Sequence, residues 1–576
     1  MTETTVGREP VQIVELVQPF CSHTFGSSPC TATGTKCFNT RASCADPDNF
    51  DKSSLSLFFS KGNVAERGVS GATYILPSLV SVSTTPTKIN LSAANPDAQG
   101  LGNRSVVSIT FADHPHTDRV VDPYVTSRGY DPFQRGSFWS KWMKRNKYRY
   151  AMTLRVYEGY AGQALSAMTK RSYILTGASG PDENGKVTLQ GKDILARIEE
   201  RKAQVPEASP GMLASGISDT ATTLKVQAAV LDDYDASGTL RIGDELVTYS
   251  AVSEVGTKLE FAVTARGTDG TTAESHDDDD TVQMCVRYTD EPVEDIVEDL
   301  LDRGDVDSTY IDTTSFADEP ADHLTAYTLS AVLSEPVAVT KLISELQEQC
   351  GFIIWWDERL AKVKMKAVRG IDADPDRLTD ADDILKNSFS VWDVPKSRIS
   401  QVWLYYNRRS QVGGFEPPDF KNVKVQADLA SESEDQFGES SVRKIRSRWL
   451  ATGPQALNTS SKIISRYRDV PRMCRFQLDA KDRAFWVGDS IEISHFLDVD
   501  EFGERNVAIW TIISAEEKQP GEVVEYTAED TTLYGRICRV QAASAADYIT
   551  GDDLFLGWIG DASGLLSDGE QAGRLS

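Results

Sequence analysis

Apolar and polar residues alternate along most of the chain, in short runs separated by turn residues. A period of two predicts β-strands whose two faces differ in polarity. Before residue 206 such runs include VQIVELVQPF (11–20), SVVSITFAD (105–113) and YAMTLRVYEGY (150–160). Their spacing is typical of a β-barrel or sandwich, which we expect over 61–205. QGKDILARIEERK (190–202) then predicts a short amphipathic helix.

Two further regions show the same alternation of apolar and polar residues and are also expected to be rich in β-strands. In 206–288 four segments predict the strands of an independent inserted module: ATTLKVQ, TLRIGDELVTYSAV, KLEFAVTARG and DTVQMCVRY. Residues 388–540 predict a second β-barrel and a terminal β-domain, interrupted by a helix near 454–468. The tail, 541–576, holds the apolar patch LFLGWIG, which we expect to dock on a partner.

Helical spacing appears between 289 and 387, which predicts an α/β part. One apolar stripe ends at Gly304, a residue suited to terminate a helix, and consists of Val293, Ile296, Val297, Leu300 and Leu301. A second helix is expected to begin near Ser334–Pro336 and to end at Gly351. FIIWWDERLAKVKMKAV then predicts a β-hairpin that turns at 357–359. The chain as a whole is therefore expected to be multidomain, β-rich and of α+β class.

Composition narrows the functions that fit this organisation. A chain of 576 residues is too long for one hydrophobic core. Its net charge of −26 argues against coating nucleic acid, so we expect no sequence-specific nucleic-acid partner. The start, MTETTVGREP, does not resemble a signal peptide, and no apolar run reaches the about 18 residues of a membrane span. We therefore expect folding in a reducing cytosol.

Four cysteines near the start are the main candidates for chemistry. Cys21, Cys30, Cys37 and Cys44 are separated by eight, six and six residues, within a segment of low periodicity that we assign to 1–60. Loops this short close at little entropic cost, so four thiolates can bind one metal ion or one iron–sulfur cluster. Structural zinc sites usually include a cysteine pair about two to four residues apart, which is missing here. Disulfides formed outside the cytosol are a further alternative.

Other clusters have ordinary structural explanations. His23 is either a substitute ligand or an exposed loop residue, and His114-Pro115-His116 is a weak metal candidate. Lys141–Tyr150 interleaves basic and aromatic residues, so it either contacts nucleic acid or a tail protein, or pairs with acidic neighbours. Asp277–Asp280 lacks the ligand spacing of a calcium loop and is expected to be solvated. No motif for nucleophilic or metal-dependent catalysis is found, so we expect no enzyme.

Several segments together resemble one known family. PVEDIVEDLLDRG, AVTKLISELQEQCGFIIWWDERLAKVKMKAV and FWVGDSIEI resemble the hub proteins of bacteriophage tail tips and baseplates. IGDELVTYSAV…ARGTDGTTAESHDDDDTV resembles a small β-module of phage tail proteins. The N-terminal cysteines fit the long-tailed branch that includes the lambda tail-tip hub and gene-transfer-agent hubs.

The resemblance implies a structural virion protein, assembled in the host cytoplasm. It implies a homotrimer that closes the tail tube, with two β-barrel tube domains in each subunit and thus six in the ring. The implied partners are the distal tail protein ring, the tape-measure protein and tail-tip or fibre proteins. Hubs of this branch carry a [4Fe–4S] cluster, which implies Cys21, Cys30, Cys37 and Cys44 as its ligands, with zinc as the alternative.

Two other functions remain as alternatives at this stage. One is a tail-associated cell-wall hydrolase, and the other is an iron–sulfur redox protein. The absence of a dinucleotide-binding motif disfavours the redox protein. If the cluster is present, we expect it to hold the loop in place rather than to transfer electrons.

Overall fold

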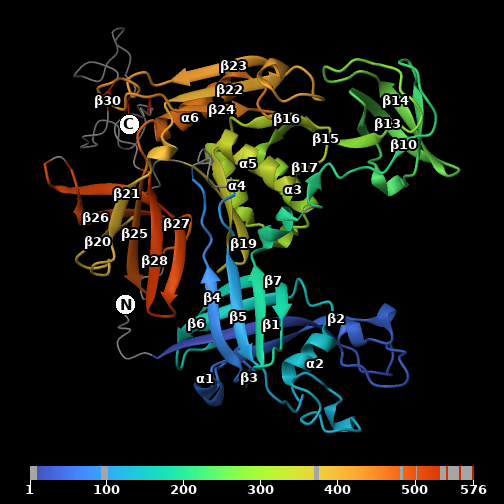
Figure 1. The fold of residues 1–576 in the computed structure, drawn as a ribbon, viewed down its shortest axis with the longest axis vertical. Helices are drawn as coiled ribbons and strands as arrows, with labels where there is room; N and C mark the ends of the chain where they lie inside the picture. Colours follow the sequence, from blue (N-terminus) through green and yellow to red (C-terminus); the bar gives the residue numbers. More distant parts are fainter. Residues whose placement is uncertain are drawn as a thin grey trace.

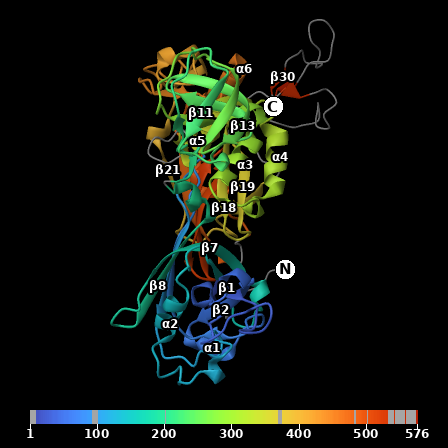
Figure 2. The same ribbon diagram turned by 90° about the vertical axis from the view of Figure 1, so that its right-hand side faces the viewer.

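The computed structural model describes residues 9–91, 101–200, 202–368, 375–480, 484–500 and 502–531. Beyond these it describes three two-residue strands: β29 (Val540–Gln541), β30 (Gly557–Trp558) and β31 (Arg574–Leu575). The molecule is elongated, with the N-terminal sheet at the lower end and the helices of residues 293–350 nearer the middle (Figures 1 and 2). Several separate hydrophobic cores confirm a multidomain, β-rich chain.

One mostly antiparallel sheet dominates the N-terminal region, in the order β3-β2-β1-β6-β7-β8-β5-β4. Helix α2 packs Trp139 between Phe59 and Phe111 in the centre of its core. The strand order has two ends, so this sheet is not a closed barrel. The elements are β1 (Pro10–Cys21), β2 (Lys52–Ser60), α1 (Gly62–Arg67), β3 (Ile75–Leu76), β4 (Leu79–Thr85), β5 (Val106–Ala112), α2 (Phe138–Arg145), β6 (Thr153–Tyr160), β7 (Thr169–Ser179) and β8 (Lys186–Lys192).

The helix expected over 190–202 is only partly helical. Strand β8 continues to Lys192, and a short 3₁₀ helix follows over Ile194–Glu199. Asp193 caps this turn, because its carboxylate accepts a hydrogen bond from the Ala196 N–H at 3.1 Å. The buried side chains of Ile194, Leu195 and Ile198 join the core of the α/β part, which leaves no separate helical face.

The inserted segment forms its own small core around Tyr234, Tyr249 and Phe261. Each of the four predicted segments forms β-structure. The segment 239–252 forms a hairpin of two strands rather than one strand. Strand β15 then continues into the next region by pairing with β16, so the sheet spans both. The strands are β9 (Gln204–Val205), β10 (Met212–Leu213), β11 (Thr223–Gln227), β12 (Gly238–Ile242), β13 (Glu245–Val255), β14 (Lys258–Ala265) and β15 (Val282–Pro292).

The α/β part contains the two predicted helices and the predicted hairpin. α3 (Val293–Arg303) ends before Gly304 as expected, and β18 (Phe352–Asp357) pairs with β19 (Lys362–Ala367). α5 (Val339–Cys350) begins three residues after Pro336, because Val337 and Ala338 first form the short strand β17 with β9. The sequence pattern did not reveal α4 (Thr313–His323), which contains Pro320 and buries few apolar side chains; β16 (Thr328–Leu333) follows it.

Residues 388–540 do not form a single β-rich unit. β22 (Gln401–Arg408), β23 (Phe420–Ala427) and β24 (Val442–Arg446) form a three-stranded sheet covered on one face by α6 (Gly453–Tyr467). Their buried side chains belong to the same core as the α/β part. The expected helix near 454–468 is α6.

The remaining strands form a second large sheet, in the order β20-β26-β27-β28-β25-β21. Its core also includes Ile89 and Leu91, which reach it from the N-terminal region, and the Ile89 N–H donates to the Ile513 carbonyl. This sheet is open at both ends as well. The strands are β20 (Asp376–Thr379), β21 (Ser390–Asp393), β25 (Arg472–Asp479), β26 (Ser490–Val499), β27 (Arg505–Gln519) and β28 (Val523–Asp530).

A buried junction joins the two large sheets. The Arg171 guanidinium lies 2.6 Å from a carboxylate oxygen of Glu158 and 3.4 Å from one of Glu517. Beside it, the Tyr160 hydroxyl donates to the Gly521 carbonyl at 2.6 Å. Among the described residues, no helix is long and apolar enough to span a membrane.

The inserted module is organised around one buried carboxylate, that of Glu245. Arg266 contacts both of its oxygens at 2.7 Å, and His276 Nε2 lies 2.9 Å away. The backbone N–H groups of Gly267 and Glu274 also donate to it. Burial opposes ionisation, but these partners outweigh it and lower the pKa of Glu245 to about 2.

We predict that Glu245→Gln destabilises the module by about 3 kcal/mol, because it leaves the buried Arg266 without its carboxylate. Hydrogen exchange of the β12–β15 amides at neutral pH measures the loss of protection. Glu254→Gln, on the exposed end of β13, is the control and is expected to have no effect. Equal protection in both variants would contradict the prediction.

The lowered pKa of Glu245 also predicts that the stability of the inserted module depends on pH in the unmodified chain. Because the folded pKa of Glu245 lies below the ordinary value of 4.5, its stabilisation is complete above that pH. It is lost progressively as the pH falls from about 4.5 towards about 2. In Glu245→Gln this acid-dependent component of the module's protection is expected to be missing.

Candidate metal centre

The four N-terminal cysteines belong to the connection between β1 and β2. Cys21 is the last residue of β1, and the other three lie in the loop that returns to β2 at Lys52. Asn39 holds the two sides of this loop together. Its side-chain amide donates to the backbone carbonyls of Cys21 and His23. Its backbone carbonyl accepts a hydrogen bond from the Cys21 N–H at 2.8 Å. Asn39 has φ 53°, a conformation that asparagine tolerates better than most residues.

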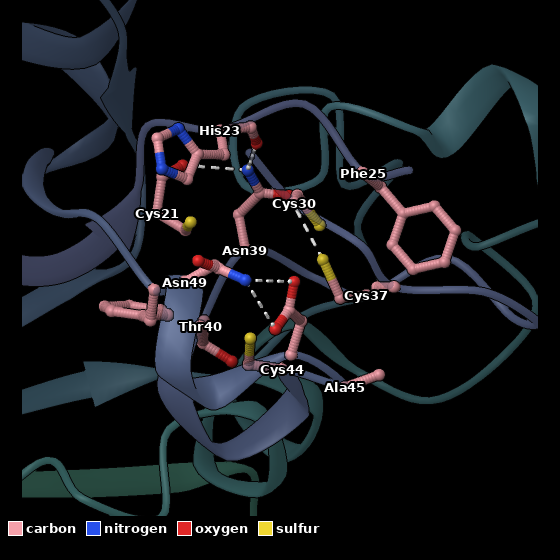
Figure 3. Close-up of a pocket in the computed structure, with 13 residues that line it drawn as sticks. Cys21, His23, Phe25, Cys30, Cys37, Asn39, Thr40, Cys44, Ala45 and Asn49 are labelled. Atoms are coloured by element: carbon pink, nitrogen blue, oxygen red, sulfur yellow. Dashed lines mark hydrogen bonds between the residues drawn. The ribbon is translucent and has the colours of Figure 1, made fainter. Parts of the chain in front are cut away.

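All four cysteines line one small cavity. Their sulfur atoms point toward a common region of the loop (Figure 3). Each is a free thiol, so the disulfide alternative does not describe this arrangement. His23 lines the same cavity, as do the apolar side chains of Phe25, Ala32 and Phe50. The four cysteines therefore share one cavity, and their binding of a metal or cluster stays a prediction.

The four cysteine side chains line the same cavity but are not clustered tightly around one point. Within the described part of the chain, no three His, Cys, Asp or Glu side chains are grouped closely enough to hold one metal ion. Burial raises the pKa of the Cys37 thiol, and the nearby Cys44, Cys21 and Cys30 raise it further. A hydrogen bond to Asn39 lowers the pKa, but the net shift is upward.

A clamp around Phe38 fastens the cysteine loop to the N-terminal sheet domain. The guanidinium groups of Arg128 and Arg145 lie 3.9 Å and 4.0 Å from the centre of the Phe38 ring. Arg128 also donates to the carbonyls of Lys36 and Cys37 at 2.7 Å and 2.8 Å, and pairs with Asp122. The loop therefore keeps its position through cation–π contacts and backbone hydrogen bonds.

The basic stretch Lys141–Tyr150 is largely committed to contacts within the chain. Its first half is the C-terminal part of α2, where Lys141 and Arg145 both bind the buried carboxylate of Asp118, at 2.8 Å and 2.7 Å. Burial opposes ionisation of Asp118, but His116, Lys141 and Arg145 together lower its pKa to about 2. The interpretation that these residues pair with acidic neighbours is confirmed for Lys141 and Arg145.

The remaining sequence candidates also have structural roles. His114 stacks on Phe138, and the buried His116 accepts a hydrogen bond from the Asp118 N–H at 2.9 Å. In the run 277–280, the Asp277 N–H donates to the Asp280 carboxylate, while the adjacent His276 belongs to the Glu245 network. The sequence did not identify Asn39, Phe38 or Arg128 as part of the cysteine site. Arg128 lies 91 residues beyond Cys37, so no local spacing indicates it.

Comparison with known proteins gives structural neighbours only. No protein-family model and no curated protein sequence matches the chain. A 43 kDa tail protein of prophage MuSo2 from Shewanella oneidensis aligns with TM-score 0.34 and 8% identity, over 78% of this chain and 97% of that one. A tail protein from Neisseria meningitidis aligns with TM-score 0.34 and 10% identity, over 75% and 89%. A chain of the native gene transfer agent virion aligns with TM-score 0.33 and 11% identity, over 58% and 91%.

We predict that Arg128→Ala loosens the cysteine loop, because it removes one face of the Phe38 clamp and two hydrogen bonds. The expected loss of about 1–2 kcal/mol corresponds to about 5- to 30-fold faster local opening. Chymotryptic cleavage at Phe25, Phe38 and Phe50 measures it. Arg135→Ala, which removes a cation from the half-buried Tyr130 ring instead, is the matched control. Equal cleavage rates in the two variants would show that the clamp does not hold the loop.

Proposed function

We propose that this chain is a structural virion protein, the hub of a phage tail tip, rather than an enzyme. The observation that carries the proposal is the pair of large antiparallel sheets, one before and one after the α/β part, held against each other within one subunit. The family resemblance of the sequence implies two tube domains in this relative order. The buried Arg171 junction supports the idea that both sheets act as one rigid unit.

Three copies of such a subunit would present six sheet domains around one axis. That number matches the hexameric ring expected above the hub, and closed cyclic symmetry is the usual form of a homo-oligomer. In this proposal the trimer closes the distal end of the tail tube. It contacts the distal tail protein ring on one side and tail-tip or fibre proteins on the other, with the end of the tape-measure protein in the channel.

We further propose that Cys21, Cys30, Cys37 and Cys44 bind a [4Fe–4S] cluster. Four free thiols around one partly apolar cavity provide the ligand number that such a cluster requires. The same four thiols are also a complete ligand set for zinc, which is the alternative. When bound, the cluster or the zinc ion would cross-link the cysteine loop. Asn39 and the Phe38 clamp orient the cysteine-bearing backbone, and Phe25 and Phe50 limit solvent access.

For the cluster, anaerobic purification is expected to give a brown protein with about four iron atoms per chain and broad visible absorbance. Cys37→Ser should lower the iron content and the absorbance. Cys285→Ala, which changes a buried cysteine of β15 outside the loop, should leave both unchanged. A colourless protein with stoichiometric zinc would replace the iron–sulfur proposal with the zinc alternative.

For the tail role, imaging of virions is expected to show three-fold density at the tail end that carries a tag attached to this chain. Particles made without the chain should lack that density. The purified protein should not clear peptidoglycan in a zymogram. Clearing of peptidoglycan would favour a hydrolase, and a tag found elsewhere in the virion would overturn the hub position.

A further inference from the structure

Two apolar surfaces lie outside every core described above. The first is the face of the β22–β24 sheet opposite α6, which we term the open sheet face. Cross-strand register places Trp403 between Val425 and Lys444, and Tyr405 between Val423 and Arg446. Val423, Val425 and Val442 are exposed by 49%, 50% and 41%. The opposite face, with Val402, Leu404 and Ile445, is buried.

The second surface is the end of the β26–β27 hairpin, residues 496–500 and 502–507, which we term the hairpin tip. Phe502 is exposed by 84%, Leu497 by 62% and Phe496 by 58%, with Val499 and Val507 also exposed. Single exposed apolar residues are common, but such a group on one short element marks an interaction site.

The exposed charges of the two surfaces are opposite. Asp500 and Glu504 are exposed at the hairpin tip, whereas Lys421 and Lys444 are exposed on the open sheet face. Arg505 near the tip pairs with Asp380, and Arg446 on the sheet face pairs with Glu416. Glu432, at the edge of the open sheet face, accepts hydrogen bonds from Gln401. An acidic apolar surface and a basic apolar surface on the same chain are complementary in both packing and electrostatics.

Both surfaces are also held in fixed shapes. The base of the hairpin is fixed by Arg472, which contacts Asp498 at 2.9 Å. The Asp500 carboxylate accepts the N–H groups of Phe502 and Glu504 and so defines the turn. The open sheet face is backed by α6, and Lys444 lies over the Trp403 ring. Such preformed surfaces lose little conformational entropy on binding.

In one subunit the two surfaces are apart. The hairpin extends from the left side of the molecule in Figure 1, whereas the β22–β24 sheet lies at the top. We propose that the hairpin tip of one subunit docks on the open sheet face of a second copy of this chain. Two different patches of one chain then meet in a head-to-tail contact, which generates a ring when the rotation closes. The proposal rests on the proposed multi-subunit hub and assigns its subunit interface.

Single substitutions on either surface test the contact in the purified full-length chain. Phe502→Asp and Val425→Asp are each expected to weaken self-association about tenfold or more, measured by sedimentation velocity over a concentration series. Val255→Asp, at an exposed apolar position of the inserted module, is the matched control and should associate like the unaltered chain. Circular dichroism of each variant verifies that the fold is retained, which is expected because all three side chains face solvent.

Mixing the two defective variants tests the head-to-tail geometry. Phe502→Asp retains the open sheet face and Val425→Asp retains the hairpin tip, so the mixture should form a complex of two chains but no ring.

A charge exchange between the two surfaces provides a second test. Glu504→Lys and Lys444→Glu should each weaken association, and a chain carrying both should recover it.

Association that is unchanged in both Phe502→Asp and Val425→Asp would overturn the interface. So would a purified chain that stays monomeric at all concentrations, or open sheet face variants that lose only binding of another tail protein. These results concern the purified chain, whereas the hub proposal is tested by the position of the tag in virions. Either proposal can therefore fail while the other stands.

Discussion

The arrangement of the molecule depends on one buried cation, the guanidinium of Arg171. Arginine stays charged in proteins, so its burial requires carboxylates nearby. Glu158 comes from the adjacent strand β6, and Glu517 comes from β27 of the other large sheet. Moving the sheets apart would leave a buried charge with fewer partners, at a cost of about 3–5 kcal/mol. The two sheets are thereby held as one body.

The same junction continues into the α/β part. Backbone and side-chain hydrogen bonds join β7 to the β18–β19 hairpin: the Ser172 N–H donates to the Glu358 carbonyl, and Trp356 Nε1 donates to the Ser172 carbonyl. Burial raises the pKa of the Glu358 carboxyl to about 7, although the nearby Arg171 lowers it. The β18–β19 hairpin and both large sheets therefore meet at β7.

Local patterns predicted a large part of the fold. The stripe from Val293 to Leu301 predicted α3, and the alternation through Val363 and Met365 predicted the β18–β19 hairpin, because each depends on which face of one element is buried. Helix α4 was missed, since it buries little beyond Phe316 and Pro320. The start of α5 was placed too early, because Val337 and Ala338 pair with β9, a strand far away in the sequence.

For the candidate metal centre, local sequence was enough to point out the candidate ligands: four cysteines in a short loop without periodicity. It also determined the apolar stripes and strands. Only the tertiary structure decided what supports them. Phe38 is clamped by residues from a distant loop and from α2, and Tyr160 bonds a carbonyl 361 residues away. The physical reason is that periodicity records burial along one element, whereas charge pairs and cation–π contacts depend on which elements the fold brings together.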